Sequence, residues 1–113
     1  MRFVIAMMKI DFTQSFNLQA KKYDWIKICY ILQRVKQPIT ANQINYYFNR
    51  IFPQNYCNTQ RIAQVIKQKK GIIHKKTFNE NRTKITTLYY FSGEIILSRT
   101  TKLNWQNKSI NLF

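Results

Sequence analysis

Apolar residues recur at helical spacing in three successive stretches of the chain. The first stretch places five of them at i, i+3, i+4, i+7 and i+10: Trp25, Ile28, Cys29, Leu32 and Val35. This spacing predicts one buried helix face. We expect Asp24 to cap the beginning of this helix, and Pro38 to end it.

The second stretch is the best-specified helix of the chain. Thr40 is followed three residues later by Gln43, which is the spacing of a capping box. The apolar residues that follow form one face of a helix: Ile44, Tyr47, Phe48 and Ile51. Pro53 is expected to close it.

The third helix is expected to begin at Asn58 or Thr59, because either side chain can cap a helix. Its apolar face comprises Ile62, Val65 and Ile66, and its polar face comprises Gln60, Arg61, Gln64, Lys67 and Gln68. Gly71 follows Lys69 and Lys70, and its position suits a left-handed helix stop.

Two runs rich in β-forming residues follow, at 72–78 and 83–91, with a polar turn at 79–82 between them. Together they predict a hairpin. In the second run Ile85, Thr87, Tyr89 and Phe91 alternate with other residues, so we expect Tyr89 and Phe91 to point into the core. Tyr46, Tyr56 and Tyr90 are the tyrosines that we expect to be exposed.

The remaining segments are an N-terminal extension, 1–23, and a C-terminal extension, 92–113, around a core of about 24–91. We find no repeat and no Gly/Ser linker, and 113 residues suffice for one domain. The apolar run near the N-terminus is too short for a signal peptide or a membrane span. The tail is expected to add a strand or to contact a protein partner.

Charge changes this picture most. The chain has 19 Lys and Arg against 4 Asp and Glu, a formal net charge of +15, yet 45% of its residues are hydrophobic. The chain is therefore expected to fold, and the scarcity of acids indicates a polyanionic partner. A membrane surface ranks last, because no helix here combines a Lys-rich face with an apolar face that the core does not need.

Candidate chemistry is sparse. One histidine, His74, and two distant cysteines, Cys29 and Cys57, match no standard zinc spacing, and neither a nucleophile arrangement nor a phosphate-binding glycine loop is present. We therefore expect no enzyme activity, no metal and no cofactor. Two reduced thiols suit an intracellular, reducing compartment, whether cytoplasm, nucleus or organelle matrix.

The polar face of the third helix carries the candidate nucleic-acid contacts. Arg61 and Gln64 lie three residues apart, and these side chains can bind guanine and adenine edges, respectively. Plain solvation of this face, or contact with phosphates alone, is an equally simple alternative. The full candidate set is Asn58, Thr59, Gln60, Arg61, Gln64, Lys67, Gln68, Lys69 and Lys70 on the helix, with Lys75, Lys76, Arg82 and Lys84 on the hairpin.

The element order from Pro38 to Phe91 resembles the winged helix-turn-helix superfamily. The resemblance implies an α+β fold with three helices and a C-terminal hairpin wing, whose second turn-pair helix enters the major groove of duplex DNA. The link at 52–57 is longer than a tight turn. Two alternatives stay open: a structural ribonucleoprotein component that binds folded RNA, as the acid depletion favours, and a winged-helix module that binds a protein.

Overall fold

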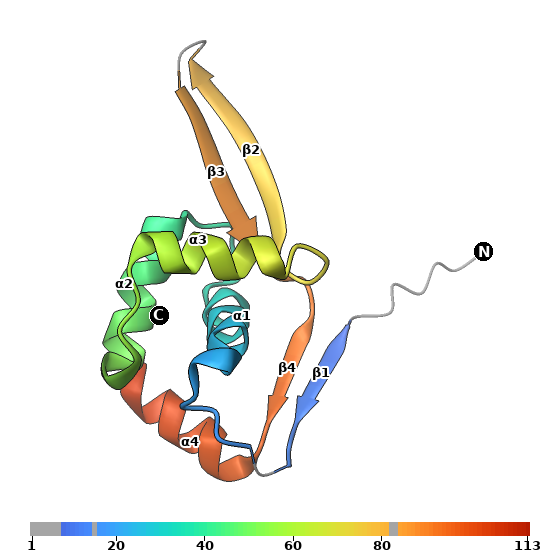
Figure 1. Ribbon diagram of the computed structural model, residues 1–113, viewed down its shortest axis with the longest axis vertical. Coiled ribbons are helices and arrows are strands. Elements are labelled where there is room, and N and C mark those ends of the chain that lie inside the picture. The colour runs from blue at the N-terminus through green and yellow to red at the C-terminus, as the bar shows by residue number, and fades with distance from the viewer. Residues whose placement is uncertain (1–7, 15, 82–83) are drawn as a thin grey trace, which may run out of the picture.

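The fold is α+β, with helices and two small pairs of strands (Figure 1). The computed structural model describes residues 8–14, 16–81 and 84–113, and their side chains except those of residues 80, 81 and 84. The helices are α1 (Asp24–Val35), α2 (Ala41–Ile51), α3 (Thr59–Gln68) and α4 (Arg99–Lys108). The strands are β1 (Lys9–Phe12), β2 (His74–Asn81), β3 (Lys84–Tyr90) and β4 (Glu94–Leu97), and short 3-10 turns occupy Lys21–Tyr23 and Pro53–Asn55.

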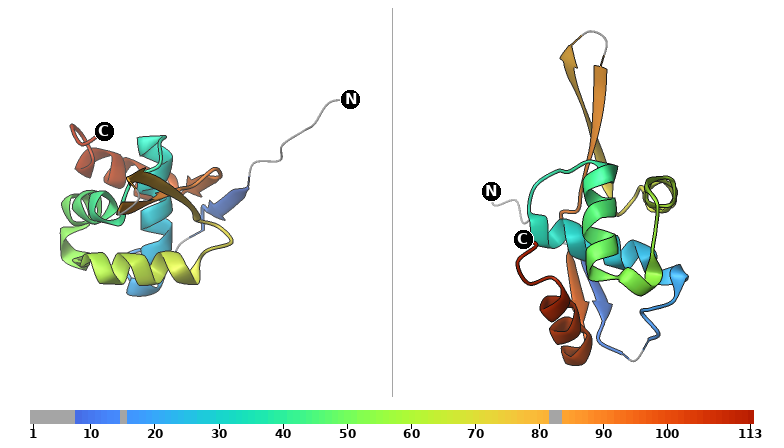
Figure 2. Two further views of the ribbon diagram at one scale, coloured as in Figure 1. Left: turned by 90° about the horizontal axis from the view of Figure 1, so that it is seen from above. Right: turned by 90° about the vertical axis from the view of Figure 1, so that its left-hand side faces the viewer.

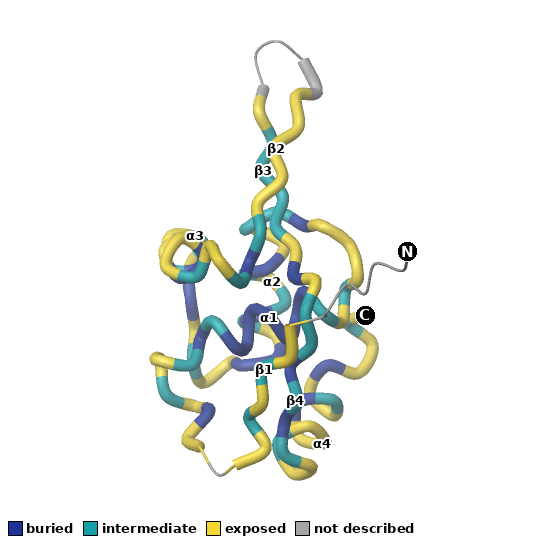
Figure 3. The backbone as a smooth tube through the Cα atoms, turned by 90° about the vertical axis from the view of Figure 1, so that its right-hand side faces the viewer, coloured by how far each residue is buried: buried dark blue, intermediate teal, exposed yellow. Residues whose placement is uncertain are grey.

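Helix α1 is the centre of the molecule (Figure 3). The expected face is buried at Ile28, Cys29 and Leu32, but Ile26 and Ile31 on other sides of the helix are also fully buried. Residues 26–32 are all buried, so this part of the helix is packed on every side and not only along the predicted apolar face. The helix ends at Lys36, which adopts a left-handed φ of 63°, two residues before Pro38.

The predicted cap of α1 is wrong. Tyr23 occupies the cap position and makes no side-chain cap hydrogen bond, while Asp24 is the first helical residue. The Asp24 carboxylate faces inward instead, where it lies near the Lys27 ammonium. An ion pair with a buried cation has therefore replaced the expected hydrogen bond to the helix backbone.

The capping box of α2 is confirmed. The backbone N–H of Gln43 donates to Thr40 Oγ1 at 3.2 Å, and the backbone N–H of Thr40 donates to Gln43 Oε1 at 2.9 Å. Ile44, Phe48 and Ile51 are fully buried. Together the cap and this face hold α2 against α1 and α3.

Helix α3 has the expected inner face, with Ile62, Val65 and Ile66 buried. Asn58 is its cap and accepts a hydrogen bond from the Arg61 amide at 2.8 Å. The predicted glycine stop is wrong, because Gly71 does not adopt a positive φ. The Lys69 amide instead closes the helix by donating to the carbonyls of Val65 and Ile66.

Strands β2 and β3 form an antiparallel hairpin that stands away from the body beside α3 (Figures 1 and 2). At its base, Ile39 and Tyr89 exchange two backbone hydrogen bonds of 3.0 and 2.7 Å, so the segment before α2 adds a short third strand position. Phe91 is buried and Tyr89 is partly buried, as expected. Ile85 is 70% exposed, because the outer half of the hairpin extends beyond the core.

The two terminal extensions meet each other. Strand β1 pairs in parallel with β4, in register from Lys9 with Glu94 to Phe12 with Leu97. Helix α4 then packs through Trp105, whose ring centroid lies 4.8 Å from that of Phe52 and 5.1 Å from that of Tyr30. None of the helices in the described part of the chain is long and apolar enough to cross a membrane.

Candidate nucleic-acid interface

The outward face of α3 presents a row of polar side chains. Because Ile62, Val65 and Ile66 point into the core, the helix turns Gln60, Gln64, Lys67 and Gln68 to the solvent, and all four are exposed. Asn58, Gln60, Arg61, Ala63, Gln64 and Lys67 line one shallow surface hollow. The exposed Ala63 lies among these longer side chains, so it leaves room for a ligand to approach the helix backbone.

Arg61 is drawn toward α1 rather than outward with Gln64. Its Nε lies 3.6 Å from Asp24 Oδ2, and its side chain is 37% exposed. This contact lies on the Nε side of the guanidinium, and Arg61 lines both the α3 hollow and a second hollow beside Asp24. Arg61 therefore lies at the edge of the polar face, where the Asp24 carboxylate holds its side chain.

Asp24 is the centre of a buried polar cluster, which we define as Asp24, Lys27, Asn55, Cys57 and Arg61. Lys27 is fully buried, and its Nζ lies 3.4 Å from Asp24 Oδ1 and 3.2 Å from Asn55 Oδ1. Burial lowers the pKa of Lys27, and the Asp24 carboxylate opposes that shift. The cluster ties the beginning of α3 to α1.

The Cys57 thiol completes the cluster by donating to Asp24 Oδ2 at 3.7 Å. Burial, reinforced by the Asp24 carboxylate, raises the pKa of the Cys57 thiol to about 11. Burial also raises the pKa of the Cys29 thiol, to about 12. Both thiols are therefore protonated at neutral pH and are poor nucleophiles.

Two further candidates on α3 are held by neighbouring helices. Thr59 Oγ1 donates to Asn42 Oδ1 of α2 at 3.0 Å. Lys69 Nζ lies 4.6 Å from the centre of the Trp25 ring of α1, in a cation–π contact. These two side chains therefore do not join the exposed row of Gln60, Gln64 and Lys67.

The second half of α3 and the base of the hairpin enclose a groove of about 580 Å³, which we call the α3–hairpin groove. Its cationic side chains are Lys67 from α3, Lys70 from the turn that follows α3 and Lys75 from β2, with His74 beside them. None of these lysines pairs with a carboxylate that the structure describes. The groove therefore concentrates positive charge from α3, from the turn after it and from β2.

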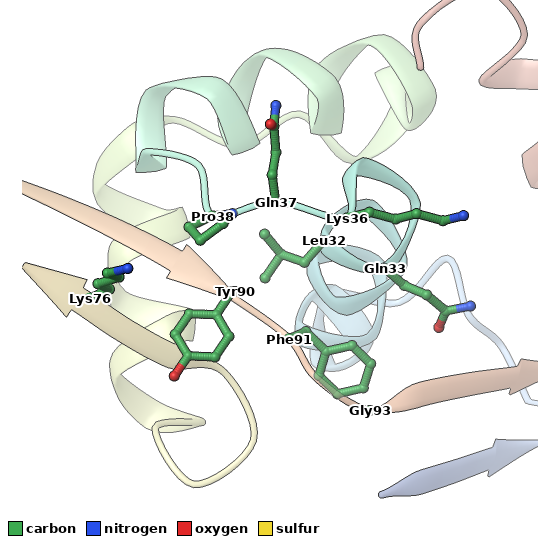
Figure 4. Close-up of a pocket in the computed structure, with 9 residues that line it drawn as sticks. All are labelled: Leu32, Gln33, Lys36, Gln37, Pro38, Lys76, Tyr90, Phe91 and Gly93. Atoms are coloured by element: carbon green, nitrogen blue, oxygen red, sulfur yellow. The ribbon is translucent and has the colours of Figure 1, made fainter. Parts of the chain in front are cut away.

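Lys75 and Lys76 lie on opposite faces of the hairpin. Successive residues of a strand alternate between faces, and in this register Lys75 is opposite Tyr89 whereas Lys76 is opposite Leu88. Lys76 lines a different groove, with Pro38 and Tyr90 (Figure 4). The sequence places the two lysines side by side, but only Lys75 joins the α3–hairpin groove.

Arg82 and Lys84 are the last two candidate contacts. Arg82 is outside the described residues, and Lys84 begins β3 without a described side chain. Within the described residues, no group of three His, Cys, Asp or Glu side chains is placed to hold a metal ion.

No protein-family model, curated protein or solved structure matches this chain.

The sequence missed the buried polar cluster because Lys27 sits between apolar neighbours, where a lysine is ordinarily expected to reach the solvent. The one available signal was the spacing of Asp24 and Lys27, three residues apart on a helix. The contact of Arg61 with Asp24 joins residues 37 positions apart, and no local pattern indicates it.

Proposed function

We propose that this chain is a winged-helix protein that binds duplex DNA through α3 and the β2–β3 hairpin. The element order α1, Ile39, α2, α3, β2 and β3 supports this proposal, as does the pairing of Ile39 with Tyr89 beside the hairpin. In a winged helix, the third helix enters the major groove and the hairpin contacts the flanking backbone.

The observation that carries the proposal is the α3–hairpin groove. Lys67 of α3, Lys70 of the following turn and Lys75 of β2 line this groove together, next to the exposed polar row on α3. A phosphate backbone is the ligand that fits such a concentration of cations beside a helix of groove-entering width. Phosphate contacts of this kind set the position of the protein on the duplex but carry no sequence information.

Base recognition is assigned to the exposed row. Gln64 can bind the N6 and N7 edge of adenine, and Gln60 and Gln68 flank it. Arg61 lies at the edge of this row, and its contact with Asp24 through Nε limits the orientations of its guanidinium. The described contacts leave its terminal nitrogens as the groups for guanine or phosphate.

A titration of labelled duplex DNA at increasing salt tests the proposal. If the protein neutralises about six phosphates, log K should fall with log salt with a slope near −5. A slope near zero would contradict binding to a polyanion.

Folded RNA is the second candidate ligand, and one observation favours it. Exposed cations that do not line the groove also occur on α1, α2 and α4: Arg34, Arg50, Arg99, Lys102 and Lys108. In Figure 1, α4 lies at the opposite end of the molecule from the hairpin. Charge on several sides suits a ribonucleoprotein component that is surrounded by RNA, and a folded RNA competitor in the same titration distinguishes the two ligands.

A further inference from the structure

One face of the hairpin shares only its base, at His74 and Tyr90, with the α3–hairpin groove. His74, Lys76 and Phe78 of β2 are opposite Tyr90, Leu88 and Thr86 of β3, and we call these six residues the aromatic face. The other face of the hairpin turns toward the body at its base, where Tyr89 packs against the hydrophobic core. The aromatic face carries its side chains on the other side of the same strands.

Two rings of the aromatic face are open to solvent. Phe78 is 48% exposed and Tyr90 is 37% exposed. The His74 ring centroid lies 5.2 Å from that of Tyr90, so the base of the hairpin presents two adjacent rings. Phe78 lies opposite Thr86, four residues from Tyr90, which separates the two rings by roughly 13 Å along the strand.

The aromatic face continues into a groove of about 570 Å³ at the junction of hairpin and body (Figure 4). Leu32 and Pro38 form apolar walls beside the rings of Tyr90 and Phe91. Lys76 lies on the hairpin side of this groove and Lys36 lies on the α1 side. The surface thus combines exposed rings with two cations that make no ion pair with a described carboxylate.

We propose that the aromatic face and this groove bind a single strand of nucleic acid. Unpaired bases stack on Phe78 and Tyr90, and Lys76 and Lys36 neutralise the backbone. Aromatic side chains interleaved with cations are the arrangement that binds single strands with little sequence preference. A duplex does not fit this face, because its bases are stacked on one another and offer no free ring surface. The site extends the proposed duplex contact to a second ligand on the hairpin.

Phe78 is the residue that separates the two sites. Tyr90 lines both grooves and His74 lines the α3–hairpin groove, whereas Phe78 lines neither of them. Ile85 provides a matched control, since it is an exposed apolar side chain of the same hairpin on the opposite face. Neither substitution removes a core residue, so both variants are expected to fold.

The test is fluorescence anisotropy with short labelled oligothymidylate, oligouridylate and duplex DNA. Phe78→Ala should weaken single-strand binding about five- to 150-fold, which is the loss of one stacked base. Ile85→Ala should leave it unchanged, and both variants should bind the duplex as the unaltered protein does. Binding of either oligonucleotide supports the site, and the one that binds more tightly identifies DNA or RNA as the preferred single strand.

Three results would overturn the inference: no single-strand binding, equal losses for the two variants, or retention of affinity by Phe78→Ala. The last of these would leave a protein partner as the occupant of the aromatic face. A lysine pair sharpens the test, because Lys76→Ala should lower the single-strand salt slope by about 0.7 and Lys75→Ala should not. If duplex binding fails while these single-strand results hold, the proposed function falls and the single-strand site stands.

Discussion

The two ends of helix α3 use their polar side chains differently. At its beginning, Asn58 caps the helix, Thr59 binds Asn42, and Arg61 contacts the buried Asp24. Near its end, Lys67 and, in the following turn, Lys70 are exposed and line the α3–hairpin groove with Lys75. The beginning of the helix is anchored to the core, and its end presents positive charge to the solvent.

The stability of the fold and the proposed binding of nucleic acid are therefore expected to depend on different parts of α3. Substitutions in the buried polar cluster should change the free energy of unfolding, whereas substitutions in the groove should change affinity for polyanions. The predictions below test that separation, beginning with the largest expected effect.

Asp24→Asn should destabilise the fold by about 3–5 kcal/mol, because it leaves the fully buried Lys27 ammonium without its carboxylate. Urea denaturation followed by circular dichroism measures this loss. The double variant Asp24→Leu with Lys27→Met is the control, and it should recover most of the stability since apolar side chains replace both charges. A loss below about 1 kcal/mol for Asp24→Asn would show that the cluster does not anchor α3.

Cys57 makes the same region sensitive to alkaline pH. Its folded pKa is raised from 9.0 to about 11, so the unfolded thiol loses its proton first, and the folded state loses stability as pH rises from 9 to 11. Compared with Cys57→Ala, the unaltered protein should lose up to about 1.4 kcal/mol per pH unit in this window. An equal dependence of unfolding free energy on pH in the two proteins across this window would contradict the burial of the Cys57 thiol beside Asp24.

Gln64→Ala tests the exposed row. If Gln64 binds an adenine edge, the variant should lose about 1–3 kcal/mol on a selected duplex and little on a scrambled one. Lys67→Ala is the matched control one turn away, and it should weaken both duplexes equally because a phosphate contact is independent of sequence. Equal losses on both duplexes for Gln64→Ala would exclude base recognition by this residue.

Local rules account for what the sequence predicted correctly. The capping box of Thr40 and Gln43, the Asn58 cap and the buried Ile62, Val65 and Ile66 all depend on residues within one or two helical turns. Such patterns are visible in a single sequence, because spacing alone decides which side chains share a helix face.

Contacts between distant residues account for what the sequence missed. The pairing of β1 with β4 joins residues 85 positions apart. It also requires Gly93, because the Cβ of any other residue there would lie 2.6 Å from the Met8 carbonyl oxygen. Lys69 is one of the candidate nucleic-acid contacts, and no local pattern indicates that its ammonium lies over the Trp25 ring of α1. The split of Lys75 and Lys76 between two grooves likewise depends on which hairpin face meets the body.

The most direct test of the central claim compares two triple variants in one salt titration on duplex DNA. Lys67→Ala, Lys70→Ala and Lys75→Ala together remove the cations of the α3–hairpin groove, whereas Arg99→Ala, Lys102→Ala and Lys108→Ala remove an equal charge from α4. The groove variant should lower the magnitude of the salt slope by about 2.7, which is roughly 0.9 for each lost phosphate contact, and the α4 variant should leave the slope unchanged. Equal reductions in the two variants would contradict a binding surface at α3 and the hairpin.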